Sequence, residues 1–158
     1  MSQNIETNMM IIEETMKNWH LYLKGEFPGG LDELLADDVE FYSPIVFTAQ
    51  KGKALTKMYL AAAGNTFSGG DKEKAPGNEN FKYAKEVLCG NYAVLEFESM
   101  VDGKYVNGVD IITCNDEGKI TEFKVMIRPL QAVNVMHEQM KAILEKMQAD
   151  SESASAQS

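Results

Sequence analysis

Apolar residues recur every three or four positions near the start of the chain. They lie at Met9, Ile12, Met16, Trp19 and Leu23. This spacing places them on one stripe of a helix, and such a stripe normally faces a hydrophobic core. The pattern therefore predicts a helix over Met9–Leu23, which the glycines and the proline at positions 25–30 bring to an end.

The next segments predict short helices and one strand. Leu31–Ala36 has room for one or two helical turns, and Val39–Ser43 is typical of a short strand that ends before Pro44. Lys53–Ala63 carries apolar residues at helical spacing and predicts a third helix. The stretch Ser68–Asn80 is polar and rich in glycine, so we expect a mobile loop there.

Four strand-like runs then lead to a last helix. The runs are Phe81–Cys89, Tyr92–Val101, Tyr105–Cys114 and Lys119–Arg128. Turn sequences such as Asp102-Gly103 separate them, which is typical of antiparallel hairpins. A helix with an apolar stripe follows Pro129 and reaches Met147. The order predicts an α+β fold in one domain over residues 8–148, with a flexible N-terminus over 1–7 and a disordered tail over 149–158.

The hairpin at Asp102-Gly103 determines which residues share a face of the sheet. A two-residue loop sets Val101 opposite Lys104 and, counting in steps of two, Leu95 opposite Asp110. Asp110 therefore faces the same way as an otherwise apolar set of side chains.

The loop after the third run decides what lies beside Asp110. With four loop residues, Asn115–Gly118, Asp110 lies opposite Phe123 on the apolar face. That face carries Leu95, Phe97, Phe123, Val125 and Ile127. With three loop residues and a bulge at Gly118, the register moves by one and Asp110 becomes a surface partner of Lys124. The pattern alone leaves both registers open.

Asp110 stands out chemically because it is an acid among apolar neighbours. Burial disfavours the charged form of a carboxyl group and raises its pKa. A neutral carboxylic acid can donate a hydrogen bond to an oxyanion, and an acid that titrates near neutrality can move protons. Asp110 is therefore the candidate catalytic acid or oxyanion donor.

The opposite face of the sheet mixes charged and apolar side chains. Its members are Val94, Glu96, Glu98, Val109, Ile111, Glu122, Lys124 and Met126. Such a surface is too polar for a core and unusually apolar for solvent. It predicts a homodimer through the sheet, and a solvated face is the alternative.

Composition narrows the classes of function. A chain of 158 residues with 44% hydrophobic and 25% charged residues is typical of one soluble domain. The net charge of −9 disfavours nucleic acid and anionic membranes as partners. The two cysteines, Cys89 and Cys114, lack a zinc-type spacing. We therefore expect no metal, no cofactor and a cytoplasmic location.

Two stretches of the chain resemble the nuclear transport factor two-like superfamily, especially its ketosteroid isomerase-like and SnoaL-like polyketide cyclase branches. They are Leu35–Pro44, followed by Gly52 at the start of a helix, and Val109–Ile120. The resemblance covers about residues 9 to 147. It implies a cystatin-like cone, in which a curved sheet wraps around the N-terminal helix, with an apolar pocket at the open end and a dimer through the sheet.

The resemblance also implies roles for single residues. Asp110 matches the isomerase's oxyanion-holding aspartic acid. The isomerase's proton-shuttling aspartate falls on Ser43, and its oxyanion tyrosine falls near Trp19, a place that Tyr22 could also approach.

Together these observations predict an apolar pocket for a small hydrophobic or aromatic molecule. Its expected lining is Trp19, Tyr42, Ser43, Tyr59, Leu95, Phe97, Phe123, Val125 and Ile127. One hypothesis is isomerase or cyclase chemistry on an enolisable carbonyl compound at Asp110. The other is a non-catalytic module that binds a ligand or a partner protein. His20 and His137 have no acid or serine at a triad spacing, so we expect both to be structural.

Overall fold

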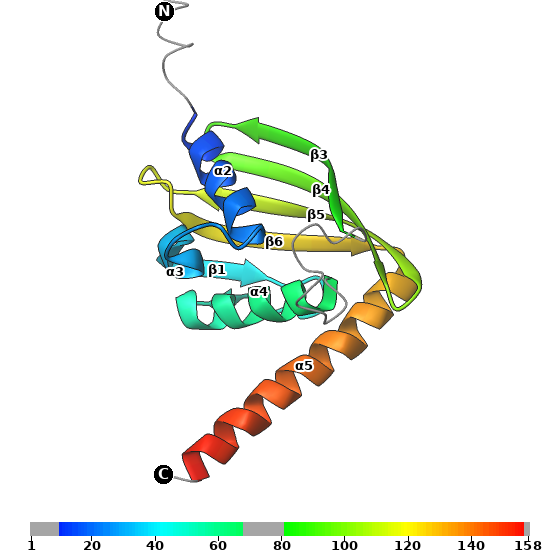
Figure 1. Ribbon diagram of the computed structural model, residues 1–158. Coiled ribbons are helices and arrows are strands. Elements are labelled where there is room, and N and C mark those ends of the chain that lie inside the picture. The colour runs from blue at the N-terminus through cyan, green and yellow to red at the C-terminus, as the bar shows by residue number, and fades with distance from the viewer. Residues whose placement is uncertain (1–9, 68–80, 157–158) are drawn as a thin grey trace, which may run out of the picture.

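The computed structural model describes residues 10–67 and 81–156, which form one curved sheet with helices on its concave side (Figure 1). The helices are α2 (Ile11–Leu23), α3 (Gly30–Leu34), α4 (Lys53–Phe67) and α5 (Leu130–Ala156). The strands are β1 (Leu35–Tyr42), β2 (Gln50–Lys51), β3 (Lys82–Cys89), β4 (Tyr92–Val101), β5 (Lys104–Cys114) and β6 (Ile120–Arg128). The flexible N-terminus predicted over 1–7 and the loop predicted over Ser68–Asn80 lie outside the described residues.

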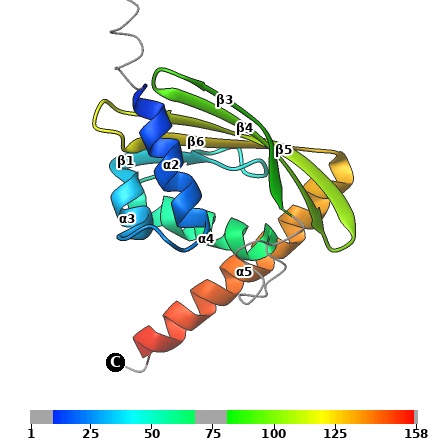
Figure 2. The same ribbon diagram turned by 45° about the horizontal axis from the view of Figure 1, so that its top comes forward.

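The sheet is mixed and has the strand order β2-β1-β6-β5-β4-β3. β1 runs parallel to β6, and the other neighbouring strands run antiparallel. Figure 2 shows α2 and α4 on the same side of the curved sheet, while α5 follows β6 and extends beyond it. The predicted α+β fold, with a curved sheet around an N-terminal helix, is confirmed.

The predicted β4–β5 register is also confirmed. Val101 pairs with Lys104, and Leu95 pairs with Asp110. Asp102 and Gly103 both have positive φ angles, 52° and 77°, as a two-residue hairpin turn requires. The orientation of Asp110 that the turn sequence predicts is therefore confirmed.

The predicted β5–β6 pairing is wrong by two residues. Asp110 pairs with Val125 rather than with Phe123, because the register shifts between Thr113 and Cys114. Lys119 also belongs to the loop, where its backbone N–H donates to the Asn115 side chain at 3.0 Å. A shift of two leaves every side chain on the expected face. Asp110 therefore still faces the core.

The alternative register, in which Asp110 lies beside Lys124 on the surface, is wrong. Lys124 pairs with Ile111 on the outer face. Its ammonium lies 3.4 Å from the Glu122 carboxylate of the same strand.

Two element ends differ from the sequence-based expectation. Strand β1 already begins at Leu35, where the pattern predicted the last turn of a helix. Helix α5 runs to Ala156, although a disordered tail was predicted from position 149. Extending an existing helix requires no new nucleation, so even a polar segment that contains alanine and glutamate can continue it.

Candidate functional site

Asp110 lies in the middle of β5 and points into the core. Its side chain is buried, with 6% exposure, and it accepts a hydrogen bond on Oδ2 from the Tyr83 hydroxyl at 2.9 Å. Burial raises the pKa of Asp110 to about 7, and the hydrogen bond from Tyr83 lowers it less than burial raises it. The carboxyl group can therefore carry a proton at neutral pH.

Tyr83 connects Asp110 to the N-terminal helix. The Trp19 indole N–H donates to the Tyr83 hydroxyl at 3.0 Å, so that this hydroxyl accepts from α2 and donates to β5. Burial, followed by the negative charge of Asp110, raises the pKa of Tyr83 well above its ordinary value. Tyr83 is thus a neutral donor at physiological pH. We refer to Trp19, Tyr83 and Asp110 as the Asp110 site.

The sequence analysis missed Tyr83 because of a bulge in the edge strand. Tyr83 pairs with Phe97, but the register shifts before Lys85, which pairs with Glu96. A regular strand counted back from the turn at Gly90 would place Tyr83 opposite Glu98, on the outer face. The sequence did contain a signal for this bulge. The aromatic residues at positions 81 and 83 are each separated from the core-facing Leu88 by an odd number of positions, so a regular strand could not place them all on the same face.

The sequence around His20 suggested a histidine without partners, but the structure gives His20 two partners on β3. Its Nε2 lies 2.5 Å from Glu86 Oε1 of β3, and its ring meets the Tyr83 ring edge-on at 5.6 Å between centroids. Glu86 pairs with Leu95, which pairs with Asp110 in the next strand. The His20–Glu86 pair thus ties the edge strand to α2 in the same row of the sheet as Asp110.

Most of the expected lining residues surround Asp110 on the concave face. Trp19, Leu95, Phe97 and Phe123 are buried, whereas Val125 and Ile127 are half-buried. Val125 is the direct neighbour of Asp110 in β6. The buried members form a floor, and the half-buried ones keep surface that a ligand can contact.

The expectation that Tyr42 lines the site is wrong, because Tyr42 lies on the opposite, outer face of the sheet. Its hydroxyl donates to the Glu40 carboxylate at 2.9 Å, and the Lys124 ammonium lies 4.7 Å from its ring centroid. These partners lie on the outer face, because Phe41 takes the inward position in β1. Tyr22 stacks on Trp19 with centroids 5.4 Å apart, and the contact with Asp110 is made by Tyr83.

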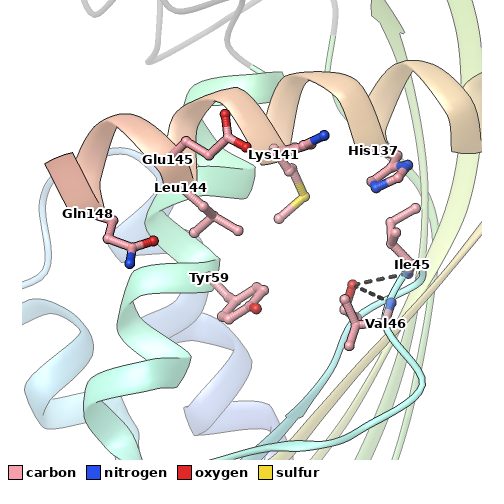
Figure 3. A pocket seen from close by; sticks show the side chains of 10 residues that line it. Ile45, Val46, Tyr59, His137, Lys141, Leu144, Glu145 and Gln148 are labelled. Carbon is pink, nitrogen blue, oxygen red and sulfur yellow. Dashed lines mark hydrogen bonds between the residues drawn. The ribbon is translucent and has the colours of Figure 1, made fainter.

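A pocket of about 240 Å³ opens between α4, α5 and the loop that follows β1 (Figure 3). It is lined by Ser43, Ile45, Val46, Tyr59, His137, Met140, Lys141, Leu144, Glu145 and Gln148. We refer to it as the helix pocket. Ser43 and Tyr59, two of the expected lining residues, lie here and not beside Asp110, which does not line this pocket.

Ser43 has a structural task in the loop after β1. Its Oγ accepts hydrogen bonds from the backbone N–H groups of Ile45 at 3.0 Å and Val46 at 3.4 Å. This arrangement stabilises a tight turn. A serine hydroxyl held in this way is no proton-accepting base.

A row of aromatic rings connects the two regions. Tyr59 contacts Phe41 at 5.5 Å, Phe41 contacts Phe123 at 6.0 Å, and Phe123 contacts Trp19 at 5.2 Å between centroids. Tyr59 belongs to the helix pocket and Trp19 to the Asp110 site. The row therefore packs continuously from one region to the other, and Met140 of the helix pocket also belongs to the same core cluster as Phe97.

Within residues 10–67 and 81–156, no three His, Cys, Asp or Glu side chains gather in a way that could hold a metal ion. In the same part of the chain, no helix combines the length and apolar character needed to cross a membrane.

Solved structures with the same fold include an enzyme. A steroid delta-isomerase from Pseudomonas aeruginosa matches with a TM-score of 0.77 and 26% identity, over 90% of this chain and 98% of its own. An uncharacterised protein with a cystatin-like fold from Silicibacter pomeroyi matches with a TM-score of 0.67 and 28% identity, over 81% and 83% of the two chains.

A third structure is similar in fold alone. It is a nuclear transport factor two-like protein of unknown function from Mesorhizobium loti, with a TM-score of 0.59 and 17% identity over 75% of this chain and 92% of its own. No family model matches the sequence, and no curated protein matches it.

Proposed function

We propose that this chain, which has the fold of the nuclear transport factor two-like superfamily, binds a small apolar or aromatic molecule at the Asp110 site. For a ligand with an enolisable carbonyl group, the reaction that we propose is isomerisation or cyclisation without a cofactor. The observation that carries this proposal is the buried Asp110 carboxyl, which Tyr83 holds by one oxygen only.

The hydrogen bond from Tyr83 indicates which oxygen of Asp110 is free to face the ligand. Tyr83 donates its proton to Oδ2, so the proton of the neutral acid belongs on Oδ1. From there it can donate to a carbonyl oxygen and stabilise the negative charge that develops when the neighbouring carbon loses a proton to water, which returns a proton to the enolate as the product forms. The pKa of about 7 keeps a large share of Asp110 in this protonated form at neutral pH.

Apolar side chains supply the remaining contacts of the proposed ligand. Val125 and Ile127 are half-buried on the concave face, and Val125 lies directly beside Asp110. Trp19 and Phe123 contribute flat aromatic surface to the same cluster. Such a lining, with one polar anchor, is the usual composition of a site for small apolar molecules.

The similarity to a steroid delta-isomerase supports an enolisable carbonyl compound as the ligand class. Ser43 supports the second candidate function, which is binding without turnover. Its Oγ is engaged by the backbone N–H groups of Ile45 and Val46, so no proton acceptor stands at the position that matches the isomerase's shuttling aspartate. The two candidates share the Asp110 site and differ in whether a proton is moved.

Calorimetric titration with 2-tetralone and tetralin tests the binding site. The two molecules have the same carbon skeleton, but only 2-tetralone has a carbonyl oxygen for Asp110. We expect 2-tetralone to bind about fivefold to tenfold more tightly, as one buried hydrogen bond provides. Asp110→Leu should remove this preference, and the outer-face control Tyr42→Phe should keep it. Equal affinities in the wild type would contradict the proposal.

Deuterium exchange distinguishes the enzyme from the binding module. The α-hydrogens of 2-tetralone exchange in D₂O through its enolate, and proton NMR follows their loss. We expect the wild-type protein to accelerate this exchange over buffer, and Asp110→Leu to lose the acceleration. Selective binding without any acceleration would establish the non-catalytic function.

Partners and location are further parts of this proposal. We propose a homodimer through the outer face of the sheet, where Val94, Tyr105 and Met126 are exposed beside charged residues. A mixed surface of this kind suits an interface with a polar rim. The acidic charge balance supports neither nucleic acid nor membrane as a partner, and we propose the cytoplasm as the compartment.

A further inference from the structure

We propose that the helix pocket is a second binding site, separate from the Asp110 site, and that it takes an aliphatic monocarboxylate of medium chain length. This inference goes beyond the proposed function and does not depend on it. It follows from the chemistry of the side chains that line the pocket and from their distribution between its two ends.

Apolar side chains from three segments form the walls of the pocket. Ile45 and Val46 come from the loop after β1, Tyr59 from α4, and Met140 and Leu144 from α5. Figure 3 shows Leu144 and Tyr59 facing each other across the space between the two helices. An alkyl chain laid along α5 would cover these apolar surfaces and remove them from water.

Three hydrogen-bond donors line the pocket: Ser43, His137 and Lys141. His137 and Lys141 lie one turn apart on α5, and Figure 3 shows His137 near Ile45. The Ser43 Oγ accepts from two backbone N–H groups, and the described part of the chain offers its own proton no acceptor. This proton is therefore available to a ligand. A carboxylate, which accepts hydrogen bonds and carries negative charge, complements these three groups.

The opposite end of the pocket sets the orientation of the ligand. Glu145 and Gln148 follow one and two turns further along α5 from Lys141. Glu145 repels a carboxylate at that end, which leaves the donor end near His137 as the place for the charged group. The alkyl chain then extends towards Leu144.

The size of the pocket limits the length of the ligand. Its volume of about 240 Å³ is smaller than that of sites for drug-sized molecules, which begin at roughly 300 Å³. Residues 137 to 148 span about 16 Å of helix, which an extended chain of about eight carbons does not exceed. Octanoate is therefore a suitable probe.

Calorimetric titration with octanoate and 1-octanol tests the site. The two chains have the same length, but only octanoate carries a charge for the donor end. We expect octanoate to bind more tightly than 1-octanol to the wild type. Lys141→Gln should weaken octanoate binding about threefold to fivefold, as expected for an exposed ion pair, and leave 1-octanol unchanged. Lys146→Gln, on the same helix but outside the lining, is the matched control.

A pocket-filling variant tests whether the two sites are separate. Leu144→Trp should abolish binding of octanoate, while binding of 2-tetralone at the Asp110 site stays unchanged. Circular dichroism verifies that the variant is folded, and Leu144→Phe serves as a milder second variant. The inference is wrong if octanoate binds no better than 1-octanol, or if Leu144→Trp leaves octanoate binding intact. It is also wrong if both pocket-filling variants abolish 2-tetralone binding, because the two regions would then form one site.

Discussion

The Asp110 site and the helix pocket are built in opposite ways. At the Asp110 site, Trp19 and Asp110 are buried in an apolar core, and the half-buried Tyr83 joins them through hydrogen bonds. At the helix pocket, Met140 is buried, whereas charged groups such as Lys141 lie at the solvent-exposed rim. The charged side chain is thus buried in one region and exposed to solvent in the other.

Burial, rather than residue type, determines whether the pKa of a charged group is shifted towards neutrality. Burial raises the pKa of Asp110 to about 7, because its ionised form loses hydration that the single bond from Tyr83 does not replace. The rim groups of the helix pocket keep their water and are screened by salt. The Asp110 site is therefore suited to proton transfer, and the helix pocket is suited to weak selection between charged and uncharged ligands.

The largest expected effect comes from breaking the aromatic row that joins the regions. Phe123 is buried between Phe41 and Trp19, so Phe123→Ala should lower the free energy of unfolding by about 3–5 kcal/mol. Tyr59, at the pocket end of the row, is only half-buried, and Tyr59→Ala should cost less. Urea unfolding measures both values. The fully exposed Phe47 provides a control, Phe47→Ala, with little change. Equal losses for Phe123→Ala and Tyr59→Ala would contradict the comparison.

The pH dependence of stability tests the burial of Asp110 next. Its pKa is about 7 in the folded protein and near 3.8 in the unfolded chain. Between these values the folded state holds a proton that the unfolded state has released. The contribution of Asp110 is therefore fully present below pH 3.8 and is lost as the pH rises through about 7, by at most about 4 kcal/mol.

Asp110→Asn isolates this contribution, because asparagine does not titrate. Urea unfolding at pH 5 and pH 8 should show the wild type losing more free energy of unfolding than the variant between the two values. Parallel pH profiles for the two proteins would mean that the Asp110 carboxyl is hydrated.

A smaller effect should follow from removing the Tyr83 hydroxyl. Tyr83→Phe leaves the Trp19 N–H and Asp110 Oδ2 without this partner, which should cost about 1–3 kcal/mol. Because the hydrogen bond from Tyr83 lowers the pKa of Asp110, that pKa should rise above its value of about 7. Carbon-13 NMR of the aspartate carboxyls measures it.

Tyr105→Phe is the matched control for this change. The Tyr105 hydroxyl also donates to a carboxylate, that of Glu98 at 3.1 Å, but on the exposed outer face. We expect a change in stability of less than about 0.5 kcal/mol and no shift in the pKa of Asp110. A similar loss for both variants would show that the hydrogen bond in the core is worth no more than the one at the surface.

The smallest effect on stability is expected for the outer face of the sheet. Met126→Glu places a charge in the proposed dimer interface, where Met126 is exposed in a single chain. The monomer should remain folded with nearly unchanged stability, and sedimentation equilibrium should show half the molecular mass of the wild type. Phe47→Glu lies outside this face and should not change the mass. A wild-type protein that sediments as a monomer would refute the proposed homodimer.

The orientation of Asp110 could be predicted because short-range turn chemistry determines it. Asp102 and Gly103 adopt the two positive φ angles of a tight hairpin turn, which leaves one pairing of β4 with β5. The β5–β6 pairing was wrong by two residues, since a bulge after Thr113 and the loop bonds of Asn115 are not visible in a hydrophobic pattern.

Tyr83 and the helix pocket could not be predicted for different physical reasons. The bulge before Lys85 turns Tyr83 to the inner face, and its partners Trp19 and Asp110 are distant in sequence. The helix pocket depends on the distance between α4 and α5, which side-chain packing sets across the whole domain. We expected Ser43 beside Asp110, but it lines the helix pocket.

The hydrogen bond from Trp19 to Tyr83 has a practical consequence, because Trp19 is the single tryptophan of the chain. Excitation at 295 nm selects its indole alone, and its emission responds to the polarity and hydrogen bonding of its surroundings. The fluorescence of the unlabelled protein is therefore an optical signal from the Asp110 site itself, whereas events confined to the helix pocket should leave that spectrum unchanged.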